Sequence, residues 1–276
     1  MKLVTFQWNH EELPGILTGD AVAPLRDYGT MLELIRSGDR PGLPAERIPL
    51  HEVTLLSPIP RPEQDVICLG MNFADHTAEA AKFHPTMVRE DYAVYFSKRV
   101  NEAVGDGGFI DAHADVTSKL DYEAEVAFIL GRDAYRVPAE RAREYVFGYT
   151  ILNDVSAREV QTRHKQFYLG KSFDTFTPIG PCIVTADEYP FPPEIDVRCW
   201  VNGELRQDGN TRPWIFGIQD VIADLSAAMT LRAGTIVSMG TPSGVGMGFE
   251  PPKFLKPGDE VRCWAEGLGN LTNTVR

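Results

Sequence analysis

The sequence predicts an α+β fold in which strands outnumber helices, and two observations carry this prediction. The pair Asn202-Gly203 separates two strand-like runs and is a strong hairpin signal, because both turn positions favour positive φ. A hairpin makes part of the sheet antiparallel, which argues against a regular alternation of strand and helix. Helical patterns are few and short. Beyond residue 60, strand-like runs occur at residues 65–70, 93–96, 121–131, 146–153, 180–185, 196–201, 235–239 and 260–265.

The first 55 residues predict a small unit of short strands with one helix. A turn is expected at Thr18-Gly19-Asp20, and a helix over residues 30–37 that ends near Gly38. The proline-rich stretch at residues 57–62 cannot continue a helix or a central strand. We therefore predict two domains, residues 1–60 and residues 61–276.

Composition limits the classes of partner. A net charge of −12 and a pI near 5.0 argue against nucleic acid and anionic membrane surfaces as partners. No stretch approaches the roughly 18 apolar residues of a membrane span, and the N-terminus lacks a signal-peptide pattern. A cytoplasmic protein is the expectation. The cysteines, which we expect to be reduced core residues, are Cys68, Cys182, Cys199 and Cys263.

A glycine-rich loop at residues 244–248 superficially resembles a dinucleotide-binding turn. Such a turn must be followed directly by a helix whose N-terminus holds the pyrophosphate. Here Pro251 and Pro252 follow and block that helix. We reject a nicotinamide-dependent enzyme, whereas a turn that binds substrate oxygens remains possible.

Two glutamates begin the run at residues 121–131. Side chains alternate along a strand, so Glu123 and Glu125 share a face with Ala127 and Ile129. Both faces are apolar beyond Glu125, which predicts a buried strand, where two like charges repel unless a cation or protons neutralise them. The alternative is a strand end in solvent with two hydrated glutamates, and spacing alone does not separate the two.

A third carboxylate, Asp154, follows the run at residues 146–153. Considered alone, it is best explained as the N-cap of a helix that includes residues 156–159. Joined to Glu123 and Glu125, it would complete a set of hard oxygen ligands that suits Mg²⁺ or Mn²⁺, with waters in the other positions.

Arg158 and Gln161 lie four and seven residues after Asp154, on one face of the predicted helix with it. The simpler interpretation is an Asp–Arg pair on a solvated helix. The functional interpretation places a guanidinium and an amide beside the metal, where they would bind a substrate carboxylate and oxo group.

His76 and Glu79 are neighbours on a predicted helix start whose cap is Asn72 or Asp75. A carboxylate bonded to one imidazole nitrogen raises the basicity of the other, which is what activating a water requires. A capped, solvated helix explains the pair equally well. We expect the following loop, residues 83–87, to be a lid that orders on ligand binding.

Two further segments offer polar groups. Lys171 could stabilise a developing enolate, with Asp174 orienting it and contributing to the substrate-binding site, or the two could form a surface ion pair. Thr241 could present its hydroxyl, and the surrounding loop its N–H groups, to a carboxylate, or the loop could be only a tight turn.

Taken together, these segments resemble the fumarylacetoacetate hydrolase family from about residue 67 to the C-terminus. The resemblance implies a catalytic domain built as a mixed β-roll, commonly assembled as a homodimer, and residues 1–60 resemble the small N-terminal domain of many members. It rests on five motifs in order, GMNFADHTAE, LDYEAEVAFILGR, GYTILNDVSARE, GKSFDTFTPIGP and MGTPSGVG.

The resemblance also implies roles for the candidate residues. Some members supply a fourth acidic ligand just before the histidine region, where this chain has Asn72 and Asp75, so three protein ligands are expected. The expected cation is Mg²⁺ or Mn²⁺, with Ca²⁺ a possible occupant in a crystal. The implied roles are metal ligation by Glu123, Glu125 and Asp154, water activation by His76 and Glu79, and substrate contacts by Arg158, Gln161, Lys171 and Thr241.

The function predicted on this basis is hydrolytic C–C cleavage of a small 2,4-dioxo acid of the acylpyruvate type. His76, oriented by Glu79, would deprotonate the water, and the metal and Lys171 would stabilise the enolate leaving group. One alternative is decarboxylation of oxaloacetate or isomerisation of an unsaturated 2-oxo dioate of aromatic catabolism, such as 2-hydroxyhepta-2,4-diene-1,7-dioate. A more distant alternative is a non-catalytic module that binds metal or anions.

Overall fold

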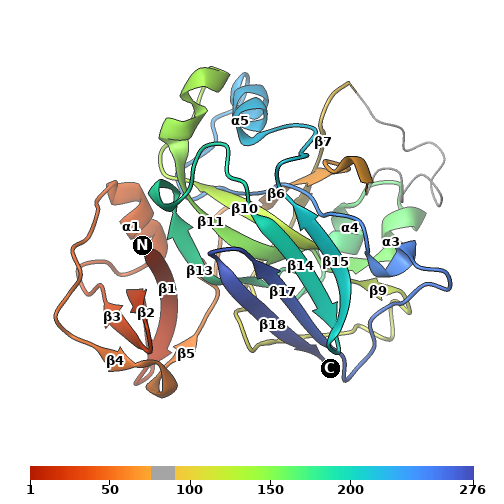
Figure 1. Cartoon of the computed structure of the whole chain (residues 1–276), viewed down its shortest axis with the longest axis horizontal. Helices are drawn as coiled ribbons and strands as arrows, with labels where there is room; N and C mark the ends of the chain where they lie inside the picture. The colour runs from red at the N-terminus through yellow and green to blue at the C-terminus, as the bar shows by residue number, and fades with distance from the viewer. Residues whose placement is uncertain (76–90) are drawn as a thin grey trace.

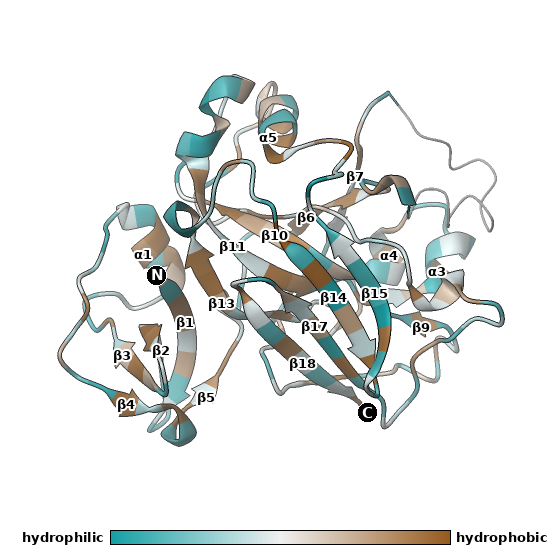
Figure 2. Cartoon of the chain, in the orientation of Figure 1, coloured by the Kyte–Doolittle hydropathy of each residue, from teal (hydrophilic) through white to brown (hydrophobic). Residues whose placement is uncertain are grey.

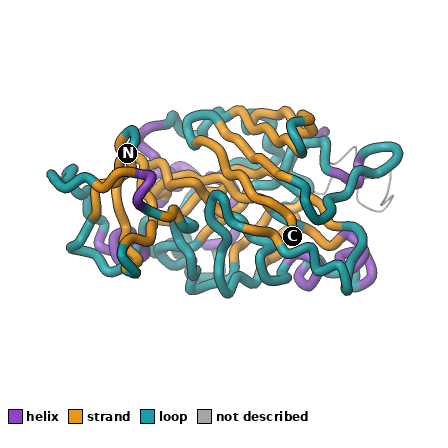
Figure 3. Tube along the Cα trace, turned by 90° about the horizontal axis from the view of Figure 1, so that it is seen from below, coloured by secondary structure: helices purple, strands orange, loops and turns teal. Residues whose placement is uncertain are grey.

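Two β-sheets form the body of the molecule, and short helices lie at its margins (Figures 1 and 3). The computed structural model describes residues 1–75 and 91–276. Within these residues, parallel pairs occur beside antiparallel ones, since β16 pairs with β6 and β18 with β8 in parallel. Mixed sheets with few short helices confirm the predicted α+β class.

The large sheet contains eleven of the described strands. Its strands in spatial order are β4 (Ile48–Pro49), β3 (Ala21–Pro24), β2 (Glu11–Thr18), β1 (Lys2–Trp8), β13 (Ile179–Thr185), β11 (Val146–Asn153), β10 (Ala124–Leu130), β16 (Ile236–Ser238), β6 (Val66–Gly70) and β7 (Val94–Lys98), and β5 (Thr54–Leu55) pairs with β1.

A second sheet of five described strands packs against the first. Its order is β15 (Glu204–Asn210), β14 (Asp196–Val201), β17 (Glu260–Ala265), β18 (Gly269–Val275) and β8 (Phe109–Ile110), and a separate pair consists of β12 (Ser156–Ala157) and β9 (Leu120–Asp121). The described helices are α1 (Met31–Ser37), α3 (Arg158–Arg163), α4 (Tyr168–Lys171) and α5 (Ile218–Ser226), with the 3₁₀ helices η1 (Leu50–Glu52), η2 (Ala139–Tyr145), η3 (Ala186–Glu188) and η4 (Gly246–Gly248).

The N-terminal strands continue the large sheet, because β1 pairs antiparallel with β13. Helix α1 has the predicted ends. The Thr30 side chain accepts a hydrogen bond from the backbone N–H of Glu33, and Gly38 ends the helix in the left-handed region at φ 71°. The division into domains at residue 60 stays a prediction.

The predicted strands mostly recur, but the run that carries Glu123 and Glu125 needs correction. The run at residues 121–131 is two strands, β9 and β10, interrupted at Tyr122 and Glu123. The interruption has a physical cause, since side chains take the place of ladder partners. The N–H of Tyr122 donates to Asp121 Oδ1, and the N–H of Glu123 donates to Asn153 Oδ1. The predicted hairpin at Asn202-Gly203 is confirmed, with φ of 51° and 79°.

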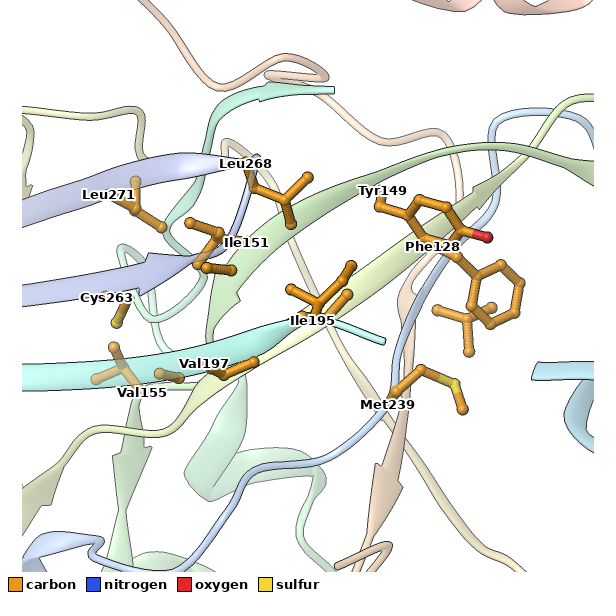
Figure 4. Close-up of a cluster of buried hydrophobic side chains, with 14 of the residues drawn as sticks. Phe128, Tyr149, Ile151, Val155, Ile195, Val197, Met239, Cys263, Leu268 and Leu271 are labelled. Atoms are coloured by element: carbon orange, nitrogen blue, oxygen red, sulfur yellow. The ribbon is translucent and has the colours of Figure 1, made fainter. Parts of the chain in front are cut away.

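The main core lies between the two sheets. Figure 4 shows side chains of this core, among them Phe128 on β10, Ile151 on β11, Val197 on β14 and Cys263 on β17. Strand β14 alternates between buried and half-buried residues, and the same alternation is visible as brown and teal bands in Figure 2. Every residue of β10 is buried, because a second apolar cluster covers its other face, as the sequence predicted.

The four cysteines are free and buried, as predicted. Among the described helices, none is long and apolar enough to cross a bilayer.

Substitution of Gly148 by alanine should destabilise the fold. Gly148 lies on β11, and an added Cβ would stand 2.4 Å from the Val184 carbonyl oxygen and 2.7 Å from Ile183 Cγ2. Because backbone in a sheet centre cannot yield easily, we expect a loss of about 1–3 kcal/mol in the free energy of unfolding, measured by urea denaturation. Gly42→Ala, where an added Cβ meets nothing within 4 Å, should change it by no more than about 0.5 kcal/mol. Equal effects of the two variants would contradict the close approach of β13 to Gly148.

Candidate active site

Three buried carboxylates meet where β10 begins and β11 ends. The antiparallel register pairs Ala124 with Asn153, so Glu123 and Asp154, the next residues outward, are adjacent, and Glu125 lies one residue inside β10. Oxygens of Glu123, Glu125 and Asp154 lie within 4.8 Å of one another. The three residues are 5%, 1% and 0% exposed, so the alternative of a hydrated strand end is wrong.

Two buried lysines contact this cluster. The Nζ atom of Lys171, at the end of α4, lies 2.8 Å from Glu123 Oε2 and 2.8 Å from Asp154 Oδ2. The Nζ atom of Lys98, at the end of β7, lies 2.5 Å from the other Asp154 oxygen, Oδ1, and donates to the Val155 carbonyl at 3.1 Å. Asp154 therefore has a lysine ammonium on each oxygen.

Lys98 is a site residue that was not predicted from the sequence. The predicted strand at residues 93–96 stopped two residues early, and β7 extends to Lys98. The available signal was strand alternation, since Val94, Phe96 and Lys98 point to one face. A lysine on the same face as apolar residues was therefore a candidate for a buried charge.

Arg158, the first residue of α3, joins the cluster from the other side. Its Nη2 lies 2.7 Å from Glu123 Oε1 and its Nε lies 2.8 Å from Asp121 Oδ2. Its Nη1 donates to Gln161 Oε1 at 3.1 Å. The predicted proximity of Arg158 and Gln161 is therefore present, and both lie next to the carboxylate cluster.

Asp121 is a second residue that was not predicted, although it begins the same motif. It is fully buried. Besides Arg158, it accepts hydrogen bonds from the backbone N–H groups of Gly246 at 2.6 Å and Met247 at 3.0 Å. Asp121 thus ties the glycine-rich loop to Arg158. The loop's N–H groups face a protein carboxylate in this structure.

Glu125 differs from the other two carboxylates, because it forms no ion pair with the described residues. Its Oε2 accepts hydrogen bonds from Ser238 Oγ at 2.5 Å and from the Gly240 N–H at 3.1 Å. Burial, with the nearby charges of Asp154 and Glu123, raises the pKa of Glu125 well above its ordinary value. A proton or a cation on this carboxylate is therefore strongly favoured.

Lys171 and Arg158 keep their charge in spite of burial. Burial is the largest single influence on Lys171 and lowers its pKa, but the charges of Asp154 and Glu123 outweigh it, so the net pKa is raised. Arg158 shows the same balance, with Asp121 and Glu123 raising its pKa against burial. Both side chains are charged at neutral pH.

The described cluster holds one more carboxylate than it holds cations. Three of these carboxylates, Glu123, Glu125 and Asp154, are oxygen donors at one point, with no sulfur or imidazole among the described donors. That donor set fits a hard divalent cation such as Mg²⁺ or Mn²⁺. The acids are Asp121, Glu123, Glu125 and Asp154, and the cations are Lys98, Lys171 and Arg158.

Two local predictions around Asp154 are wrong. Helix α3 begins at Arg158 with Ala157 in the cap position, so Asp154 is neither its N-cap nor on its face. The reason is that β12 intervenes and the Asp154 oxygens are bonded to Lys98 and Lys171. The solvated Asp154–Arg158 pair is also wrong, because Arg158 pairs with Asp121 and Glu123.

The predicted orientation of Lys171 by Asp174 is wrong as well. Asp174 is exposed, and its Oδ1 accepts a hydrogen bond from Asn101 at 3.3 Å. Lys171 is instead oriented by Glu123 and Asp154, which are distant in sequence. A substrate contact by Asp174 therefore has no support from its position.

Thr241 and Asn72 have structural partners. The Thr241 hydroxyl donates to the Ala124 carbonyl at 2.9 Å and accepts from Gln207 Nε2 at 2.8 Å, so its proton is used within the protein. The Asn72 amide nitrogen donates to the carbonyls of Met239 and Phe216. Both residues hold the loop that follows β16 in place. The role of Thr241 in substrate binding stays a prediction.

The predicted water-activating pair, His76 and Glu79, lies outside the described residues. The predicted lid at residues 83–87 also lies outside them. The carboxylate cluster is therefore described without these residues, from Glu123, Glu125, Asp154 and the side chains that contact them.

Replacing Glu125 by glutamine should stabilise the metal-free protein, increasingly so as pH rises. A buried carboxyl with a raised pKa costs nothing below pH 4.5, its ordinary pKa, and the cost grows as pH rises toward the folded-state pKa. Glutamine removes that cost and still accepts the bonds from Ser238 and Gly240. We expect the stability gap between variant and wild type to widen by up to about 1.4 kcal/mol per pH unit above pH 4.5.

Urea denaturation in the presence of a chelator, repeated across pH, measures this gap. Glu260→Gln, which changes an exposed glutamate, is the matched control and should show little pH-dependent change. A gap that shrinks as pH rises would contradict the burial of an unpaired carboxylate at Glu125.

The chain is similar to characterised proteins over most of its length. The family model described as fumarylacetoacetate (FAA) hydrolase C-terminal matches residues 65–276. The oxaloacetate tautomerase YisK of Bacillus subtilis (strain 168) is 44% identical over 226 residues, which are 82% of this chain and 74% of the relative.

Two solved structures share the fold. The fumarylacetoacetate hydrolase EaFAH from the psychrophilic Exiguobacterium antarcticum is 38% identical with a TM-score of 0.90, covering 100% of this chain and 99% of that chain. The maleylpyruvate hydrolase from Sphingobium sp. SYK-6, in complex with manganese(II) and pyruvate, is 30% identical with a TM-score of 0.78, covering 100% and 98%. From the matched domain and these relatives, the chain belongs to the fumarylacetoacetate hydrolase family.

Proposed function

We propose that this chain is a divalent-metal-dependent enzyme that forms and stabilises the enolate of a small 2-oxo acid. The observation that carries the proposal is the buried meeting of Glu123, Glu125 and Asp154 with two lysines beside them. The manganese and pyruvate in the related maleylpyruvate hydrolase support both the metal and the substrate class. The match of donor set to hard cations supports Mg²⁺ or Mn²⁺.

The three carboxylates of the cluster would hold the divalent cation. A bound divalent cation would supply the positive charge that stabilises an enolate oxygen. Glu123, Glu125 and Asp154 would hold it, with Ser238 and Gly240 fixing the orientation of Glu125. These three carboxylates are buried, and in such surroundings each charge acts more strongly on a developing negative charge.

Lys171 and the α3 residues would act on the substrate. The ammonium of Lys171 carries a full charge in the cluster and would donate to the oxygen on which negative charge develops. Gln161 lies beside Arg158 and would bind the substrate carboxylate or oxo group through its amide. Arg158 would hold Gln161 and Glu123 in position for this contact.

For the overall reaction, we favour keto–enol interconversion of a 2-oxo diacid such as oxaloacetate. The reaction needs enolate stabilisation, which the described cluster supplies, and no attack by water. The 44% identity to an oxaloacetate tautomerase supports this choice. Decarboxylation of oxaloacetate would instead leave the enolate of pyruvate as CO₂ departs, and the same cluster would stabilise that enolate.

Hydrolytic C–C cleavage of an acylpyruvate-type substrate is the second candidate. It needs an activated water, for which His76 and Glu79 are the predicted residues. The similarity to a maleylpyruvate hydrolase supports it. A homodimer and a cytoplasmic location stay predictions.

Removal of divalent metal should abolish turnover of all 2-oxo acid substrates. The proposal is tested with a panel of oxaloacetate, acylpyruvates and unsaturated 2-oxo dioates, followed by ultraviolet absorbance of the enol with Mg²⁺, with Mn²⁺ and with a chelator. We expect activity only with metal, because without it the carboxylates of the cluster outnumber its cations and the site has no net positive charge to offer an enolate. Glu125→Gln should lose metal-dependent activity, and Glu260→Gln should keep it. Full activity of wild type in chelator would refute the proposal.

His76→Ala should separate the two candidate reactions. Cleavage of an acylpyruvate should fall by a factor on the order of 10² or more, because water activation is lost. Turnover of oxaloacetate in the same variant should fall far less, because the carboxylate cluster and Lys171 remain. His51→Ala, at an exposed histidine, is the matched control. Equal losses on both substrates would show that His76 does not serve water activation specifically.

A further inference from the structure

The oxygens of Glu123 and Asp154 fall into an outer and an inner pair. The outer oxygens, Glu123 Oε1 and Asp154 Oδ1, each bind a cation of their own, Arg158 at 2.7 Å and Lys98 at 2.5 Å. The inner oxygens, Glu123 Oε2 and Asp154 Oδ2, share one cation, the ammonium of Lys171, at 2.8 Å from each. Among the described side chains, Lys171 alone bridges two of the three clustered carboxylates.

The shared position conflicts with a second cation. A divalent ion held by Glu123, Glu125 and Asp154 would lie within a few ångström of Lys171 Nζ, because Nζ is 2.8 Å from an oxygen of both Glu123 and Asp154. In a buried site, like charges at that separation repel strongly. The inner oxygens can therefore serve the ammonium or the metal, but not both in the present geometry.

Lys171 is also the cation that can move. Lys98 is fixed by a sheet strand and by its second bond to the Val155 carbonyl, and Arg158 is fixed by Asp121 and Gln161. Lys171 ends the four-residue helix α4, and its bonds to the carboxylates are through its flexible terminal ammonium.

The surroundings of Lys171 confine a movement to its side chain. The backbone of α4 packs tightly on α3, since an added Cβ at Gly170 would lie 2.5 Å from the Gln161 nitrogen. The ring of Phe96 already makes a cation–π contact with Lys171 Nζ, at 5.2 Å from the ring centre, and this neighbour would remain beside a displaced ammonium.

We propose that Lys171 is the built-in counter-ion of the metal-free site, and that a divalent cation displaces its ammonium from the inner oxygens and frees it for the substrate. Lys98 and Arg158 keep the outer oxygens throughout and so hold both carboxylates in orientation. The inference rests on the proposed function, because it requires the three carboxylates to bind a divalent cation.

The test measures Mn²⁺ affinity of the full chain by electron paramagnetic resonance of the free ion. Lys171→Met should bind Mn²⁺ at least about tenfold more tightly than wild type, because a competing charge is gone. Lys119→Met, which removes an exposed lysine, is the charge-matched control and should bind like wild type. The melting temperature of metal-free Lys171→Met should fall below that of wild type, and saturating Mn²⁺ should raise it by more than it raises that of wild type.

The possible failures are distinguishable. Wild type that binds Mn²⁺, with Lys171→Met binding equally or more weakly, overturns the counter-ion role and leaves the proposed function standing. Wild type that binds no Mn²⁺ overturns the proposed function itself, and the counter-ion role with it.

A measurement on wild type covers the case in which Lys171→Met does not fold. Hydrogen-bonded buried ammonium groups exchange their protons slowly and can be followed by nitrogen-15 nuclear magnetic resonance. Addition of diamagnetic Mg²⁺ should speed proton exchange at Lys171 Nζ and leave the exchange at Lys98 Nζ slow. Unchanged exchange at Lys171 in Mg²⁺-saturated protein overturns the proposal.

Discussion

The antiparallel register between β10 and β11 sets the conditions for the rest of the site. By pairing Ala124 with Asn153, it brings Glu123 next to Asp154 at the point where both strands leave the ladder. Both strands lie in the middle of the large sheet, covered on both faces, so the carboxylates that they carry are buried as well. Repulsion between buried like charges then dictates that cations reach this point from elsewhere in the chain.

The cations arrive from three separate elements. Lys98 comes from β7 at one side of the large sheet, Arg158 from α3 and Lys171 from α4, both beyond the end of β11. Figure 1 shows α3 and α4 at the opposite end of the molecule from the N-terminal strands. Distant segments must therefore fold together before these carboxylates gain their ion-pair partners. Removing one partner of such a buried pair costs more than removing a surface ion pair, because the remaining charge stays buried.

The features that the sequence predicted correctly are those that depend on local patterns of residues. Strand alternation placed Glu123 and Glu125 together and indicated a buried β10, and the residue types at Thr30, Gly38 and Asn202 fixed a helix and a hairpin. These features depend on neighbours within a few residues of each other, so a single sequence contains their cause.

The errors share another cause, which is contact over long sequence distances. Asp154 looked like a helix cap because its real partner Lys98 is 56 residues away, and Asp121 gained a role only through Arg158, 37 residues later. Spacing rules do not extend to such pairs. Asp174 was assigned to Lys171 for the same reason, as the nearest charge in sequence. The domain boundary, His76 and Glu79 remain predictions.

The contact between Asp121 and the glycine-rich loop bears on how this family could diversify. Asp121 is bound by the backbone N–H groups of Gly246 and Met247, so the side chain at position 247 is not needed for the contact. Position 246 is constrained, because a Cβ there would lie 2.5 Å from Asp121 Oδ1. Met247 also lines a hollow of about 320 Å³ with Arg158 and Phe254. Substitutions at residue 247 can therefore change the shape of this hollow while Asp121 keeps its backbone hydrogen bonds and its ion pair with Arg158.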